Sequence, residues 1–131
     1  MLLHHVQVSM PRGEEPAARR FDAEAGGLVE VDKPSALAPR GGCWFRSVGG
    51  EQGGERVTAE IHLGVEDPFV PARKAHPALV VEDLSELEAM AARIEGVGCE
   101  VSWTERDTFD GFVRFHADDP FGNRLEVMTR L

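Results

Sequence analysis

Four side chains of metal-binding type fall on the polar faces of predicted strands: His5, His62, His76 and Glu126. Each lies in a segment where apolar and polar residues alternate, and this period of two is typical of a strand with one apolar face. Imidazole and carboxylate groups are common ligands of Zn, Fe(II), Mn, Ni and Co. The pattern therefore indicates a divalent metal site. A single histidine on a polar strand face is more often solvated or hydrogen-bonded, and that interpretation stays open here.

Glu126 follows a turn with a distinctive composition, DDPFGNRLEV at residues 118–127. Pro120 fixes its own φ and keeps the preceding residue extended, while Gly122 and Asn123 tolerate positive φ. The alternation that follows predicts a strand. Glu126 should point away from the apolar face formed by its two neighbours in the chain.

The elements that must position these residues occur in the same order twice. The first half predicts a strand at 2–10, a helix at 14–25 and strands at 28–32, 43–48 and 56–66. The second half predicts a strand at 76–81, a helix at 83–96 and strands at 99–104, 110–117 and 123–130. Asp83 is the predicted N-cap of the second helix, and a glycine-rich turn is expected at 49–54. This βαβββ repeat predicts an α+β fold with helices on one face of mostly antiparallel strands.

Length and composition limit the classes of protein to which the chain can belong. Its 131 residues suit one domain, with a first module at about 1–66, a linker at 67–75 and a second module at about 76–131. The net charge of −9 disfavours nucleic acid and anionic membrane as partners. Neither a membrane-spanning run nor a signal peptide is recognisable, and the two cysteines form no disulfide framework. A cytoplasmic location is expected.

Five segments together resemble the vicinal oxygen chelate superfamily, which contains glyoxalase, bleomycin resistance and extradiol dioxygenase proteins. They are LHHVQV at 3–8, RRFDAEAGGL at 19–28, EIHLGV at 60–65, HPALVVEDL at 76–84 and DDPFGNRLEV at 118–127. The last is similar to the family's Asp-Pro-x-Gly-Asn-x-x-Glu signature. The resemblance implies a single domain whose two βαβββ modules form a cupped, open mixed β-barrel with helices outside.

The resemblance also implies one metal in the cup and a ligand position on each of four strands. Those positions fall on His5, His62, His76 and Glu126. The metal would be Zn, Ni, Co, Mn or Fe(II), and it would chelate two oxygens of a small-molecule substrate. Chains of this kind commonly form homodimers, and His5 and His62 of one subunit would then join His76 and Glu126 of its mate. Glu126 would serve as a ligand and, in isomerase-like branches, as a base.

Further candidates share the strand faces that would line such a cup. Arg114 would bind a substrate carboxylate or phosphonate through its planar fork, and His116 would act as a general acid or base. Trp44 and Arg46 on the third strand are further candidates for substrate binding. Ordinary alternatives exist for all four: a surface ion pair for Arg114, a solvated strand end for His116 and core packing for the aromatic residue.

Three functions fit the resemblance. The leading one is a metal-dependent enzyme, a glyoxalase-like lyase or isomerase or a dioxygenase, acting on a small oxygenated substrate. One alternative is a metal-free protein of the bleomycin resistance type, which the acidic charge would suit if the ligand were a cation. Another is a thiol transferase similar to fosfomycin resistance proteins, although no lysine-rich potassium loop is evident. The histidine at position 62, where lactoylglutathione lyase has glutamate, and the absence of tyrosine argue against two familiar members of the superfamily.

Overall fold

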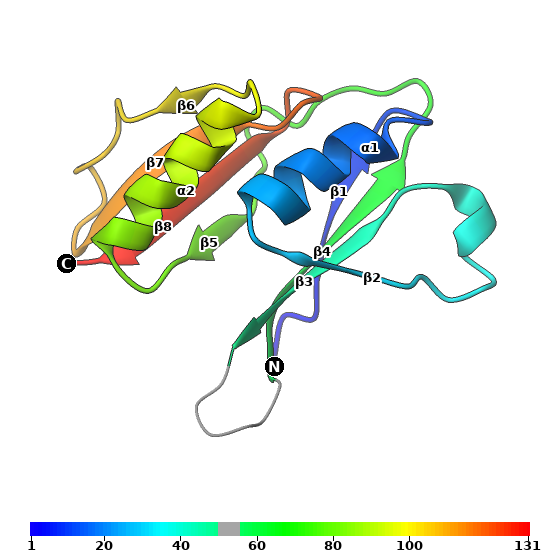
Figure 1. Ribbon diagram of the computed structural model, residues 1–131, viewed down its shortest axis with the longest axis horizontal. Helices are drawn as coiled ribbons and strands as arrows, with labels where there is room; N and C mark the ends of the chain where they lie inside the picture. Colours follow the sequence, from blue (N-terminus) through cyan, green and yellow to red (C-terminus); the bar gives the residue numbers. More distant parts are fainter. Residues whose placement is uncertain (50–55) are drawn as a thin grey trace. The chain divides into compact units, whose positions relative to one another are not determined.

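The chain divides into two compact units, Met1–Val70 and Pro71–Leu131. The computed structural model describes residues 1–49 and 56–131 (Figure 1). Each unit contains a four-stranded mixed sheet, and both follow the predicted βαβββ order. The α+β class is therefore confirmed. The predicted turn at 49–54 lies, apart from its first residue, outside the described residues.

The described residues of unit 1 form four strands and three helical segments. The strands are β1 (Val6–Met10), β2 (Val29–Val31), β3 (Trp44–Gly49) and β4 (Arg56–Val65). They lie in the order β1-β4-β3-β2, with β1 parallel to β4 and the other pairs antiparallel. The helical segments are α1 (Glu15–Ala18), η1 (Arg19–Ala25) and the short η2 (Ala38–Arg40). Phe21, Phe45, Met10 and Leu63 are buried in the core of this unit.

The predicted helix at 14–25 is present but is wider than an α-helix in its second part. The η1 segment is a π-helix, and the N–H of Gly26 donates to the carbonyl of Phe21 at 2.8 Å. A Cβ at position 26 would lie 2.6 Å from the carbonyl oxygen of Asp22, closer than real Cβ atoms approach. Glycine, which has no Cβ, avoids this crowding.

Unit 2 repeats the arrangement with more regular elements. Its strands are β5 (Ala78–Val80), β6 (Val101–Ser102), β7 (Phe112–Asp118) and β8 (Arg124–Arg130), in the order β5-β8-β7-β6. The helix α2 (Leu84–Gly96) packs against β7, β8 and β6. Asp83 is its N-cap, as predicted, because its carboxylate accepts the N–H of Glu86 at 2.9 Å. No helix among the described residues is long and apolar enough to cross a membrane.

Strict alternation along β7 decides which of its residues lie on the face of the sheet away from α2. Val113, Phe115 and Ala117 are buried on the side of α2, while Arg114 and His116 are only partly buried. Since neighbouring residues of a strand point to opposite faces, the arginine and the histidine lie on the face away from the helix. The parity predicted for both residues is correct.

Several predicted strands are shorter than expected, and this changes how two histidines are held. β1 begins at Val6 and β5 at Ala78, so His5 and His76 precede their strands. The predicted strand at 99–104 keeps only Val101–Ser102. Because His5 and His76 lie outside the sheet ladders, strand register alone does not fix their side chains.

The turn before β8 is closed by the side chain of Asp119. Its Oδ1 accepts the N–H groups of Phe121 and Asn123, each at 2.8 Å, and its Oδ2 accepts Nδ2 of Asn123 at 2.7 Å. Gly122 has φ +86°, as the composition of the turn predicted. The Oδ1 atom of Asn123 accepts the N–H of Ala72 at 2.8 Å. The start of β8 is therefore tied to the segment that leads to His76.

Candidate metal centre

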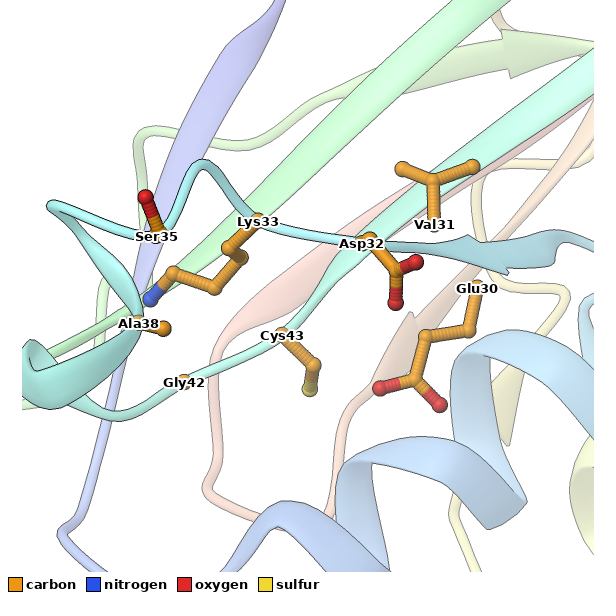
Figure 2. A pocket seen from close by; sticks show the side chains of 8 residues that line it. All are labelled: Glu30, Val31, Asp32, Lys33, Ser35, Ala38, Gly42 and Cys43. Atoms are coloured by element: carbon orange, nitrogen blue, oxygen red, sulfur yellow. The ribbon is translucent and has the colours of Figure 1, made fainter.

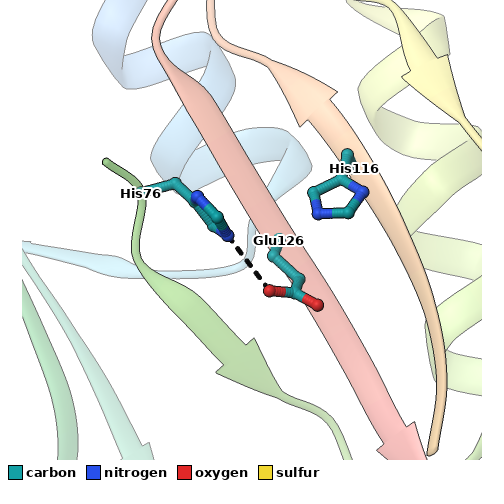
Figure 3. A group of neighbouring side chains, drawn as sticks. All are labelled: His76, His116 and Glu126. Carbon is teal, nitrogen blue, oxygen red and sulfur yellow. Dashed lines mark hydrogen bonds and ion pairs between the residues drawn. The ribbon is translucent and has the colours of Figure 1, made fainter. Parts of the chain in front are cut away.

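Three possible metal ligands converge on the sheet of unit 2: His76, His116 and Glu126 (Figure 3). One ligand atom from each lies within 4.8 Å of the others. His116 on β7 and Glu126 on β8 are directly opposite in the antiparallel pair. His76 enters from the segment before β5, where the carbonyl of Pro77 accepts the N–H of Glu126 at 3.0 Å. Neighbouring backbone hydrogen bonds thus bring all three side chains together.

His76 is oriented by a backbone carbonyl. Its Nδ1 lies 2.7 Å from the carbonyl oxygen of Lys74, and its Nε2 lies 3.1 Å from Oε2 of Glu126. A carbonyl oxygen only accepts, so Nδ1 must carry a proton. Nε2 faces a carboxylate oxygen, so a proton or a cation must lie between these two atoms. Metal-binding histidines commonly have this arrangement, with the other ring nitrogen donating to a carbonyl.

Glu126 is 6% exposed and still ionised. Burial alone would raise its pKa, but hydrogen bonds from Arg114 and His76 outweigh burial and hold the pKa below the ordinary 4.5. Nη1 of Arg114 donates to Oε1 at 2.7 Å. Glu126 therefore presents a carboxylate at neutral pH, which is the form that binds a divalent ion.

His116 joins the cluster in the form needed for a ligand. Burial lowers its pKa below the ordinary 6.5, so the ring is neutral at neutral pH. Its ring lies edge-on to that of His76, with 5.6 Å between the centroids. The sequence predicted an acid–base role for His116. The geometry also makes it a third possible metal ligand.

The donor set fits a divalent transition metal. Two imidazoles and one carboxylate form a common catalytic zinc set, in which further coordination positions stay open to water or substrate. Bond lengths of about 2.1 Å would place tetrahedral ligand atoms roughly 3.4 Å apart. The ligand atoms here lie within 4.8 Å of one another, so modest side-chain rotations would close the set around an ion.

In unit 1, His62 and Arg46 both contact Glu60, a residue that was not predicted to belong to the site. The ring of His62 lies between those of Trp44 and His5, with centroid distances of 3.8 Å and 4.0 Å. Nε2 of His62 donates to Oε1 of Glu60 at 2.6 Å, and Nε of Arg46 donates to Oε2 at 2.8 Å. Arg46 and Glu60 are paired across β3 and β4, and that opposite-charge pair is the signal that was missed.

Glu60 and His62 are 7% and 4% exposed, so the predicted polar face of β4 is buried at this point. Burial would raise the pKa of Glu60, but hydrogen bonds from His62 and Arg46 outweigh burial and lower the pKa below 4.5. Burial lowers the pKa of His62, which is therefore neutral at neutral pH. A neutral histidine thus donates a hydrogen bond to a buried carboxylate.

Replacing Glu60 by glutamine is expected to lower the free energy of unfolding by about 2 kcal/mol at pH 7, because two hydrogen bonds to a charged group are weakened. The folded-state pKa is depressed, so this contribution is present above pH 4.5 and is lost as the pH falls through the folded-state pKa. Urea unfolding at pH 7 and at lower pH values measures the effect. Glu66→Gln, at an exposed position, is the control, and an equal loss at every pH would contradict the assignment.

The structure thus divides the four predicted ligands between the units. His76 and Glu126 contact each other in unit 2, and His5 and His62 stack on each other in unit 1. Arg114, predicted to bind substrate, contacts Glu126. A metal role for His5 and His62 and a substrate role for Trp44 and Arg46 stay predictions.

A separate pocket of about 380 Å³ lies in unit 1 beside β2 (Figure 2). None of the predicted site residues lines it. Burial raises the pKa of the Cys43 thiol there to about 12, so this sulfur is protonated and is a poor nucleophile. The lining residues are Glu30, Val31, Asp32, Lys33, Ser35, Ala38, Gly42 and Cys43.

The family model of the Glyoxalase/Bleomycin resistance protein/Dioxygenase superfamily matches residues 5–127. The chain belongs to this superfamily. The resemblance read from the five sequence segments is therefore confirmed, and so is the fold of two βαβββ modules. No curated protein matches the chain.

Solved structures agree with this assignment. A protein assigned to the glyoxalase family from Bacillus anthracis is 39% identical, with a TM-score of 0.81, over 100% of this chain and 96% of that one. The integron cassette protein HFX_CASS4, from the mobile metagenome of the Halifax Harbour sewage outfall, is 22% identical, with a TM-score of 0.70, over 98% and 97%. The fosfomycin resistance protein FosX from Listeria monocytogenes is 15% identical, with a TM-score of 0.70, over 100% and 94%. At these two lower identities the likeness shows the fold alone.

Proposed function

We propose that the protein is a metal-dependent enzyme of this superfamily, in which His76, His116 and Glu126 hold a divalent ion. The observation that carries the proposal is the orientation of His76. Its Nδ1 proton is committed to the carbonyl of Lys74, and its Nε2 faces Oε2 of Glu126 at 3.1 Å. Two imidazoles beside an ionised, buried carboxylate form a donor set that favours a divalent cation over a monovalent one.

The reaction proposed is glyoxalase-like lyase or isomerase chemistry, or dioxygenase chemistry, on a small substrate with two neighbouring oxygens. The ion, when bound, would act as a Lewis acid toward those oxygens. Glu126 or His116, on leaving the ion, would accept or return a proton in this reaction. The glyoxalase family assignment of the 39% identical Bacillus anthracis protein supports the first branch.

Metal analysis of protein purified without an affinity tag tests the metal site. Wild type is expected to bind close to one equivalent of Co²⁺ or Zn²⁺. His76→Ala should bind more than about 100-fold more weakly, because the loss of a ligand exceeds the effect typical of outer-shell partners. Arg12→Ala, at an exposed position of unit 1, is the control. Equal, substoichiometric metal in all three proteins would refute the proposal.

A bidentate probe tests the open positions on the ion. Acetohydroxamate, which offers two neighbouring oxygens, is expected to shift the visible absorption bands of the Co²⁺-loaded protein. Acetamide, which offers one, is the control. Identical spectra with both compounds would argue that the ion cannot accept a chelating substrate.

The proposed assembly is a homodimer, and the proposed additional ligands are His5 and His62. Light scattering after size-exclusion chromatography measures the oligomeric state. His5→Ala in the same Co²⁺ titration measures the ligand role, since this residue is exposed and its replacement leaves the core unchanged. An unaltered Co²⁺ affinity would remove His5 from the ligand set.

A further inference from the structure

We propose that Arg114 is a positioning residue that fixes the carboxylate of Glu126 toward the two histidines of the cluster. This inference rests on the proposed metal site. It assigns to Arg114 a role different from the substrate binding that its type and strand parity suggested. The basis is the set of partners that surrounds its guanidinium group.

Arg114 makes hydrogen bonds through all three nitrogens of its side chain. Nη1 donates to Oε1 of Glu126 at 2.7 Å. Nη2 donates to Oε2 of Glu105 at 2.9 Å and to the hydroxyl of Thr108 at 2.8 Å, and Nε donates to the carbonyl of Glu105 at 3.2 Å. Four of the five N–H groups of the guanidinium are thereby used. The side chain is only 13% exposed, and this leaves little of it to meet a substrate.

The partners of Arg114 anchor it from one short segment. Glu105 and Thr108 belong to the loop between β6 and β7, and the backbone N–H of Arg114 also donates to the carbonyl of Arg106 at 3.1 Å. The guanidinium carbon lies 5.5 Å from the ring centroid of Phe109. A planar fork held at several points is a rigid support, whereas a lysine ammonium would be a single point charge.

This support selects one oxygen of Glu126. Oε1 is occupied by Arg114, so the carboxylate cannot turn freely, and Oε2 is the oxygen that lies beside His76. Glu126 would then bind an ion through Oε2 alone. Outer partners of this kind hold a ligand in its productive orientation, and their loss typically weakens metal binding.

Arg114 has two opposite effects on metal binding, so a variant at this position can distinguish between them. The positive charge near Glu126 repels a divalent cation, so removing the charge alone would tighten metal binding. The hydrogen bond orients the ligand, so removing it would weaken binding. A substrate-binding arginine would change the response to substrate and would leave the orientation of the ligand carboxylate unaltered.

The experiment is Co²⁺ titration by calorimetry and visible absorption of wild type, Arg114→Gln, Arg114→Lys and Arg106→Gln. Arg114→Gln is expected to bind Co²⁺ about 10–100-fold more weakly and to show altered absorption bands. Arg114→Lys should not restore wild-type affinity or bands, because an ammonium cannot reproduce the fork. Arg106→Gln removes a positive charge from the same loop without contacting Glu126 and should resemble wild type.

Unchanged or tighter Co²⁺ binding by Arg114→Gln, with unchanged bands, would overturn the positioning role while leaving the metal site intact. Absence of Co²⁺ binding by wild type would refute the proposed function, and this inference with it. If Arg114→Gln does not fold, Glu105→Gln decides. This variant removes one ion-pair partner of Arg114. It should weaken Co²⁺ binding about threefold, which is the scale of one partly exposed ion pair. An unchanged affinity would overturn the proposal.

Discussion

Replacing Glu126 by glutamine is expected to weaken Co²⁺ binding by more than about 100-fold, beyond the effect typical of outer-shell partners. The amide is nearly isosteric, and its oxygen still accepts from Arg114, so the fold should persist. The negative charge is lost, however, and a neutral amide is a much poorer ligand than a carboxylate. Isothermal titration with Co²⁺ at neutral pH measures the difference.

Glu95→Gln is the matched control for that experiment, because it makes the same change of charge on the exposed surface of α2. It should bind Co²⁺ like wild type. Comparable weakening in both variants would mean that the net charge of the protein, and not the cluster, governs affinity. Comparable thermal midpoints of the two variants would show that the loss at Glu126 is not a loss of folding.

Replacing Asn123 by alanine is expected to lower the free energy of unfolding by about 3 kcal/mol, since buried groups would lose hydrogen-bond partners. Asn123 is 2% exposed, and its side chain joins the carboxylate of Asp119 to the N–H of Ala72. Alanine would leave that N–H and part of the carboxylate without partners. Urea unfolding monitored by tryptophan fluorescence and circular dichroism measures the change.

The same substitution should also weaken Co²⁺ binding, because Asn123 connects the start of β8 with the segment that leads to His76. Asp118→Ala, at the exposed end of β7 next to this turn, is the control and should have a small effect on both properties. A stable Asn123→Ala protein with wild-type Co²⁺ affinity would contradict the importance given to this connection.

Side-chain alternation predicted the parts of the site that lie within regular strands. Val113, Phe115 and Ala117 are buried against the helix, and this places Arg114 and His116 on the other face. The periodicity of α2 and its N-cap at Asp83 were likewise readable, because both depend on short-range physical rules. The repeated element order then gave the fold.

The contacts of each side chain were not predictable, because strand alternation tells which face a side chain lies on but not which residues it contacts. Arg114 was predicted to face the cup, but most of its contacts come from Glu105 and Thr108, in a loop without periodicity. Glu60 was not predicted as a site residue, because its contacts with Arg46 and His62 depend on the register of β3 against β4. The π-helical winding at 19–25 has no signal in the composition of that segment.

The direct pairing of His116 with Glu126 determines which changes of chain length the site can tolerate. The two residues belong to one hairpin, β7–β8, closed by the turn that Asp119 holds. Gain or loss of a single residue within β8 before Glu126 would reverse the faces of the strand and send this carboxylate toward α2. Insertions and deletions of two residues would keep Glu126 on the same face of the sheet and change only the residue of β7 that lies opposite it. Length variation in this hairpin among functional relatives should therefore occur in pairs of residues or be confined to its turn.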